Sequence, residues 1–454
     1  MTHFIAGCSI GDLSPWEGVD LGGYPYFDRK NTGIHDPLYG TCLYLETEDK
    51  KKLLLLAGDL CYLTKAQADR IKDGITRKCG LSTDEIIISC SHSHSAPWMS
   101  GMYRSFPGQP EYESKADQKY VDFIVEKWAK TALKAISETY PAEYAYTKIY
   151  CGKEEGIGGN RTDPENGETD PSTPVMVIRK KGGPVMAIHT KYALHPTILH
   201  GENTLVSADY PGYIRKYINE SYPGAVFMFS QGTSGNQSPR YYRHGQTFSE
   251  AGRFGYSIGE KIASAITDLE YTSDLSISHE TMVLDIKMKN YGDPGMLKTK
   301  VEYYRKEKEN VIRADGSYTD IQTADMWLLG SECEYNYAKL HKEGRLSEYY
   351  SDDIPFMAHA VVLNRCAYVF LQGELFVEYG EKIKHISPYA ETNVITVSNG
   401  MTPGYCVTPE AAKTGGYEAW NSMLASDTGD KIVVSVTDML MKIYEKNREE
   451  RKHD

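Results

Sequence analysis

The sequence predicts an α/β protein with mixed β-sheets flanked by helices, and two features of its patterning support this class. Short apolar runs typical of buried strands, such as residues 53–60, alternate along the chain with segments of helical periodicity. The strands and helices do not form a regular strand–helix–strand series, which favours mixed rather than purely parallel sheets. At 454 residues, the chain is long enough for one large α/β unit with an appended subdomain.

Local signals in the first half of the chain predict each element in turn. Thr64 is suited to cap a helix, because its hydroxyl can accept a hydrogen bond from a free backbone N–H. Apolar residues at helical spacing over 120–136 predict a well-buried helix, and Gly182-Gly183 between two apolar runs predicts a hairpin. The predicted elements are strands at 53–60, 86–90, 175–179, 185–192 and 225–229, and helices at 65–78 and 120–136.

The residue pattern changes past residue 275, where a charged segment of helical periodicity replaces the short apolar runs. We expect a single catalytic domain over residues 1–454, with an internal division near 275–290 into parts 1–280 and 281–454. The elements expected in the second part are a helix at 296–308, a polar loop at 314–320, one long strand at 360–371, a helix at 375–386, a strand at 394–397 and a final helix at 431–446.

Composition narrows the class of protein. Lys and Arg total 50 against 62 Asp and Glu, a net charge of −12 with no basic stripe, which argues against nucleic acid and stable membrane association. The longest aliphatic run has five residues, far short of the roughly 20 that span a bilayer. Nine cysteines without a CxxC pair, and no visible signal peptide, predict free thiols and a cytoplasmic protein. A small molecule is the expected partner, and a homo-oligomer stays open.

Histidines and a serine follow three of the predicted strands. His92 and His94 form an HxH pair directly after the strand at 86–90, which can place one ring on a metal and the other beside a substrate. His195 follows the strand at 185–192, and Ser238 lies in a Gly-rich turn after the strand at 225–229. Taken alone, each is also compatible with an ordinary polar loop. The serine segment does not match G-x-S-x-G, which excludes the α/β-hydrolase pattern.

A series of short motifs extends over most of the chain. In order, they are Thr32-Gly33-Ile34-His35, Ser91-His92-Ser93-His94-Ser95-Ala96-Pro97, Asn160-Arg161, Leu205-Val206-Ser207-Ala208-Asp209, Asn236-Gln237-Ser238-Pro239, Gly373-Glu374-Leu375, Gly404-Tyr405-Cys406-Val407-Thr408-Pro409-Glu410 and Gly416-Tyr417-Glu418. Their order and gaps resemble those of the neutral ceramidase catalytic domain. That family consists of zinc-dependent amidases, so the resemblance implies a neutral-ceramidase-like fold and hydrolysis of an amide.

The resemblance also implies roles for individual residues. The zinc ligands would be His92, His195, Glu374 and Tyr405, and the catalytic and substrate-contacting residues would be Ser238, His94, Arg161 and Tyr417. Two imidazoles, a carboxylate and a phenolate suit a borderline cation such as Zn²⁺. Zinc polarises a carbonyl or lowers the pKa of a bound water toward about 7. Ser238 then either attacks the carbonyl or positions the water, and the sequence leaves both roles open.

The expected activity is cleavage of a carboxamide in a soluble or short-chain N-acyl compound rather than in membrane-embedded ceramide. The charge of −12, the missing signal and the missing C-terminal domain of typical ceramidases motivate this choice. The sequence departs from the family at Asn236, Arg240 and Thr162-Asp163. Two alternatives remain: a metallohydrolase acting on an ester or lactone, and a non-catalytic relative that binds a small molecule.

Three further expectations concern the surroundings of the site. His35 and Asp59 are candidates for orienting a ligand imidazole, as groups behind metal ligands commonly do, and a purely structural role is equally compatible with the sequence. Residues 101–110 form a long polar segment rich in Gly and Pro, which is compatible with a lid or with a plain surface loop.

Overall fold

The computed structural model describes residues 3–24, 29–100 and 116–453, and it has the mixed α/β class that the sequence predicts. Within these residues the larger sheet has eight strands, in the order β4-β3-β2-β1-β5-β7-β8-β9. The pairs β3–β4 and β8–β9 are parallel and the other neighbours are antiparallel. The strands are β1 (Phe4–Asp12), β2 (Tyr39–Thr47), β3 (Lys52–Gly58), β4 (Ile86–Cys90), β5 (Tyr140–Tyr150), β7 (Ser172–Lys180), β8 (Val185–Tyr192) and β9 (Val226–Gln231).

A second, smaller sheet has the order β11-β12-β13-β15, with β13 and β15 parallel. Its strands are β11 (Ile277–Val283), β12 (Met357–Leu363), β13 (Cys366–Leu371) and β15 (Glu391–Ile395). The expectation of one long strand at 360–371 is therefore wrong. Asn364 adopts a left-handed backbone with φ 55°, which asparagine tolerates better than most residues, and the chain reverses there into a hairpin.

Each segment that the sequence predicts to be helical is a helix in the structure, and the structure contains further helices. The Thr64 side chain accepts from the Gln67 backbone N–H, while the Gln67 side chain accepts from the Thr64 backbone N–H, forming the expected cap. The loop expected at 314–320 is shorter, because Ser317 caps a helix that begins at Tyr318. The helices are α1 (Lys65–Cys79), α2 (Gln118–Ser137), α3 (Tyr210–Ser221), α4 (Phe248–Ala265), α5 (Pro294–Arg313), α6 (Tyr318–Lys342), α7 (Val377–Ile386), α8 (Pro409–Thr414), α9 (Tyr417–Trp420) and α10 (Thr428–His453).

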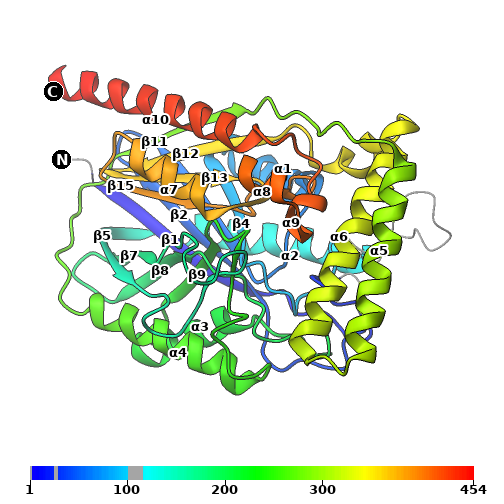
Figure 1. Ribbon diagram of the computed structural model, residues 1–454. Helices are drawn as coiled ribbons and strands as arrows, with labels where there is room; N and C mark the ends of the chain where they lie inside the picture. Colours follow the sequence, from blue (N-terminus) through cyan, green and yellow to red (C-terminus); the bar gives the residue numbers. More distant parts are fainter. Residues whose placement is uncertain (1–2, 25–28, 101–115, 454) are drawn as a thin grey trace.

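The two sheets pack face to face between outer layers of helices (Figure 1). Successive side chains of a strand point to opposite faces, so Leu53 and Leu55 pack against the smaller sheet while Leu54 and Leu56 face helices. Helices α1 and α2 cover one part of the outer face of the larger sheet, and α3 and α4 cover the other part. Helices α7 and α10 cover the smaller sheet. The apolar surface buried between these layers holds the strand ends in place.

Helices α5 and α6 form an antiparallel hairpin at one side of the layers (Figure 1). Buried Leu329 and Tyr337 of α6 join the core that contains α1 and α2. Among the described helices, none combines the length and apolar character needed to cross a membrane.

Backbone hydrogen bonds tie the ends of strands from both sheets together. The Cys90 N–H at the end of β4 donates to the Val397 carbonyl at 3.1 Å, and the Thr396 N–H donates to the Gln231 carbonyl at 2.8 Å. The Val397 N–H in turn donates to the Gly373 carbonyl at 3.0 Å. The loops after β4, β9, β13 and β15 therefore meet at one place, and loops held this way by a scaffold commonly carry function.

Candidate metal centre

The loop after β4 turns back through His92, whose backbone has φ 69°. A residue other than glycine in this left-handed region is strained, and such strain is concentrated at functional sites. The turn is held by the His92 N–H, which donates to the Leu60 carbonyl at 2.9 Å. The ring is oriented separately, because its Nδ1 lies 2.7 Å from the Cys61 carbonyl oxygen. That carbonyl accepts only from a protonated Nδ1, which leaves Nε2 as the second ring nitrogen facing inward.

His195 follows β8 and is fully buried. Its Nδ1 lies 2.9 Å from the carbonyl oxygen of Gln237, in the short strand β10 (Gln237–Ser238). As at His92, a backbone carbonyl holds the proton on Nδ1 and leaves an Nε2 lone pair on the other side of the ring. Metal-binding histidines usually donate their second nitrogen to a carbonyl or carboxylate in this way.

Glu374 begins the two-residue strand β14 (Glu374–Leu375), which pairs in parallel with β16 (Tyr405–Cys406). Its pairing partner in the ladder is Tyr405, so two of the predicted ligands stand on neighbouring strands in register. Gly373 before it has φ 79°, and a Cβ there would lie 1.8 Å from the Thr402 hydroxyl. Only glycine fits this turn, which delivers the Glu374 carboxylate into the interior.

The three side chains converge on one carboxylate oxygen. Glu374 Oε2 lies 3.2 Å from His92 Nε2 and 3.0 Å from His195 Nε2. Burial and then Arg161 lower the pKa of His195 to about 4, so at neutral pH its Nε2 lone pair faces a carboxylate oxygen. Two acceptors at this distance repel each other unless a cation lies between them.

The charge balance of the buried group also fits a cation. Burial alone would raise the pKa of Glu374, but the His92 and His195 imidazoles hold it well below its usual range. The opposite holds for His92, whose pKa is raised well above its ordinary value by Glu374 despite burial. A proton on His92 is thus the neutralising charge that a divalent metal would replace.

The donor set and spacing suit zinc. Ligand atoms of His92, His195 and Glu374 all lie within 4.8 Å of one another. Zinc bonds of about 2.0–2.1 Å in a tetrahedron place neighbouring ligand atoms about 3.3 Å apart, close to the separations found here. A second group within the described residues consists of Cys61, His92 and His94. The Cys61 carbonyl already occupies His92 Nδ1, so the first group is the better candidate.

His94, the second histidine of the HxH pair, lies beside this centre. Its Nε2 is 3.4 Å from His92 Nε2, and its Nδ1 is buried without a hydrogen-bond partner in the part of the chain that the structure describes. Burial, together with His92 and His195, lowers its pKa well below the usual value, so the ring is neutral. The Arg29 Nη2 donates to the His94 carbonyl at 2.8 Å and holds the backbone.

Gly23 packs directly against the His94 ring. A Cβ on Gly23 would lie 2.3 Å from His94 Cγ, so Gly23→Ala must displace the imidazole. If His94 serves as an acid–base group, a role that contributes about 10²- to 10⁴-fold, we expect kcat to fall by about tenfold to a hundredfold with bound metal retained. Gly18→Ala is the matched control, since Gly18 has a similar φ of 90° and nothing within 4 Å. Equal activity of the two variants would contradict the placement of His94.

Ser238 and Arg161 are brought together by a pair of two-residue strands. Strand β10 pairs with β6 (Gly159–Asn160), so Ser238 lies opposite Gly159. The Ser238 side chain is 6% exposed, and its Oγ accepts from the Arg240 N–H at 3.2 Å. The Arg161 Nη2 donates to the Gly235 carbonyl at 2.7 Å, which braces the turn that carries the serine.

Tyr405 and Tyr417 lie next to Arg161. The two tyrosine rings have centroids 5.8 Å apart, and the Arg161 guanidinium lies 5.5 Å from the Tyr405 ring centroid. Arg161 Nε is 2.7 Å from Glu418 Oε1, an ion pair that balances its charge. Burial, and then Glu374, raise the pKa of Tyr405 well above its ordinary value, so its hydroxyl is protonated when no metal is bound.

These groups open into one cavity of about 530 Å³, within the usual range for small-molecule sites. Its wall includes seven of the eight residues that the sequence singles out, and His195 is the one that does not line it. The lining from the predicted set is His92, His94, Arg161, Ser238, Glu374, Tyr405 and Tyr417. Side chains of α6 and three aromatic rings, Tyr24, Tyr62 and Trp98, form other parts of the wall.

Comparison with known proteins gives a result at the level of structure only. No protein-family model matches the sequence, and no curated protein matches it. A crystal structure of neutral ceramidase from Pseudomonas aeruginosa superposes with a TM-score of 0.73 at 14% identity, covering 98% of this chain and 75% of the other. The chain shares the fold of neutral ceramidase. A structure described as ceramidase complexed with C2 is equally similar in fold, with a TM-score of 0.73, 15% identity, and coverage of 98% and 76%.

This likeness to neutral ceramidase confirms the fold that the motifs predict. For His35 and Asp59, the contacts favour the structural alternative over a role in orienting a metal ligand. His35 is exposed, its Nε2 lies 3.0 Å from the Tyr213 hydroxyl, and its ring stacks on Phe248. Asp59 accepts from the Tyr39 N–H at 2.8 Å and from Arg215 at 2.7 Å. Within the described residues, neither side chain hydrogen-bonds to the His92 or His195 imidazole. Backbone carbonyls of Cys61 and Gln237 take that position instead. The lid expected at 101–110 lies outside the described residues.

Proposed function

We propose that the protein is a zinc-dependent hydrolase that cleaves a carboxamide bond in a soluble or short-chain N-acyl compound. The observation that carries the proposal is the convergence of two imidazole Nε2 atoms on one buried carboxylate oxygen beside a cavity. His92, His195 and Glu374 would hold the metal, with Tyr405 as the fourth ligand. When bound, zinc supplies Lewis-acid chemistry, polarising a carbonyl or activating water.

The remaining residues have separable tasks in amide cleavage. His94 is neutral, so its Nε2 can accept a proton from the nucleophile and return it to the amine, which must be protonated to leave. Ser238 lines the same cavity, as nucleophile or as the group that positions water. Arg161 and Tyr417 are proposed to donate hydrogen bonds to the substrate and to its developing negative charge.

The cavity supports a short substrate. A volume of about 530 Å³ accommodates a small N-acyl compound, and its wall mixes aromatic and aliphatic surface with charged side chains. Met326, Leu328 and Leu329 of α6 supply an apolar strip for an acyl chain. The neighbouring arginines and carboxylates favour a polar group in the rest of the substrate over a second long hydrocarbon chain.

The test is a substrate panel on the purified holoenzyme. We expect kcat/KM to rise with acyl length from acetyl to about hexanoyl on simple amines and then to level off, because the apolar strip is short. The measurement is amine release for each amide, with the matched ester and a lactone alongside. A clear optimum for long-chain ceramide in detergent micelles contradicts the short-chain claim. Cleavage of esters or lactones without amides supports the ester or lactone hydrolase, and stoichiometric metal binding with no turnover supports a non-catalytic relative.

A further inference from the structure

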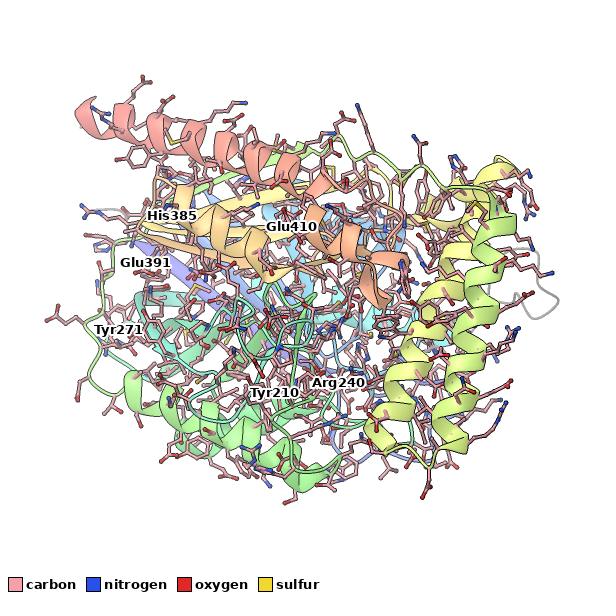
Figure 2. All side chains as sticks on the ribbon, viewed as in Figure 1. Tyr210, Arg240, Tyr271, His385, Glu391 and Glu410 are labelled. Atoms are coloured by element: carbon pink, nitrogen blue, oxygen red, sulfur yellow. The ribbon has the colours of Figure 1, made fainter. Side chains whose placement is uncertain are left out.

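The segment after Ser238 adds two arginines to the cavity wall. Arg240 and Arg243 both line the cavity, and Figure 2 labels Arg240 in the lower part of the molecule, between Tyr210 and the α5–α6 hairpin. Among the described residues, neither guanidinium has a carboxylate within ion-pair distance. Two other cations of the same wall are neutralised: Arg161 pairs with Glu418, and Lys308 pairs with Asp325.

Arg243 is held in place without being neutralised. Its Nη1 donates to the carbonyl oxygens of Thr197 and Ile198, at 2.6 and 3.3 Å. Burial, opposed by Tyr24 and reinforced by Arg240, lowers its pKa. These neutral carbonyls orient the guanidinium but leave its positive charge and remaining N–H groups available.

Further charges nearby do not cancel the two arginines. Burial lowers the pKa of His200 to about 3, and Arg243, Arg29 and Arg240 add to that effect, so several cations surround one ring. Asp209 also acts on Arg243, but it lies beyond ion-pair distance and accepts instead from the N–H groups of Leu199 and Tyr210. The chain has a net charge of −12, yet positive charge is in excess at this partly buried place. Removing unpaired charges from water costs free energy unless a bound anion neutralises them.

We propose that Arg240 and Arg243 form a subsite for an anionic group of the substrate, so that the natural substrate is an N-acyl compound bearing a carboxylate or similar anion. This inference rests on the proposed function, because it places the subsite in the cavity of the amidase. The planar guanidinium donates in a fork that matches a carboxylate. The subsite begins two residues from Ser238, whose Oγ accepts from the Arg240 N–H, so one substrate can reach both.

The test compares matched pairs of amides that differ by one charge. N-hexanoylglycine and N-hexanoylethanolamine place a carboxylate or a hydroxyl on the amine side. Glutaric acid mono-propylamide and 5-hydroxypentanoic acid propylamide do the same on the acyl side. We expect at least one carboxylate to raise kcat/KM about tenfold over its hydroxyl partner. Arg240→Gln and Arg243→Gln should each bring that ratio toward one, and Arg240→Lys should restore part of it.

Arg313→Gln is the matched control, because Arg313 is an exposed arginine of α5 outside the cavity, and it should keep the wild-type ratio. If amides are cleaved but both ratios are near one, or if the ratios do not change in the arginine variants, the subsite is refuted while the amidase stands. If no amide is cleaved, the proposed function fails. Equilibrium binding of N-hexanoylglycine against N-hexanoylethanolamine then still tests the subsite, and equal affinities would overturn it.

Discussion

His195→Ala is expected to remove the bound metal and to lower kcat/KM for amide hydrolysis by a thousandfold or more. The imidazole is fully buried, and its Nε2 is one of the three atoms that converge on the proposed cation. Metal catalysis supplies several kcal/mol of transition-state stabilisation, and about 1.36 kcal/mol corresponds to tenfold in rate. The measurements are elemental analysis after dialysis and kcat/KM on a short-chain amide.

A buried histidine can also matter for stability alone, so a second variant separates the two effects. His189 lies on β8, six residues earlier, is buried, and has its Nε2 2.9 Å from the Ser230 hydroxyl rather than near the centre. His189→Ala should lower the melting temperature but keep the metal. His385→Ala, at an exposed position labelled in Figure 2, should change neither. Full metal occupancy in folded His195→Ala and His92→Ala would refute the ligand assignment.

Elements with a strong local signal follow from the sequence. The strand Ile86–Cys90 is predicted to its ends, because its mainly apolar run stops at the polar segment 91–95. The failure at 360–371 has a physical reason, since both arms of that hairpin are buried on both faces and read as one apolar run. Only the left-handed Asn364 marks the turn, and a single asparagine is a poor signal.

Some residues of the candidate site could be predicted from the sequence, and others could not. The resemblance to the ceramidase family singles out His92, His195 and Glu374, and the structure places their side chains together, although the role of each stays a proposal. The carbonyls of Cys61 and Gln237 could not be predicted, because every residue has a backbone carbonyl and only the tertiary fold selects one. Glu418 could have been found, since it follows Tyr417 directly in a recognised motif.

Ser238→Ala should keep the metal yet lower kcat by at least a hundredfold. The serine is not among the converging ligand atoms, and the β6–β10 pairing that positions it uses the backbone, which alanine preserves. Loss of a nucleophile can cost up to about 10⁶-fold, whereas loss of a group that positions water and assists proton transfer costs about 10²- to 10⁴-fold. The size of the loss, measured at full metal occupancy, therefore separates the two roles that the sequence leaves open.

A second measurement identifies the nucleophile directly. If Ser238 attacks, amides that share an acyl group pass through one acyl-serine, and added hydroxylamine must divide the products in a constant ratio whatever amine leaves. Ser234→Ala is the matched control, because Ser234 lies on the same loop, is buried, and accepts from the Gln231 side chain away from the cavity wall. That variant should retain metal and most activity. A Ser238→Ala enzyme with wild-type kcat would show that water attacks unaided and that Ser238 serves only the turn.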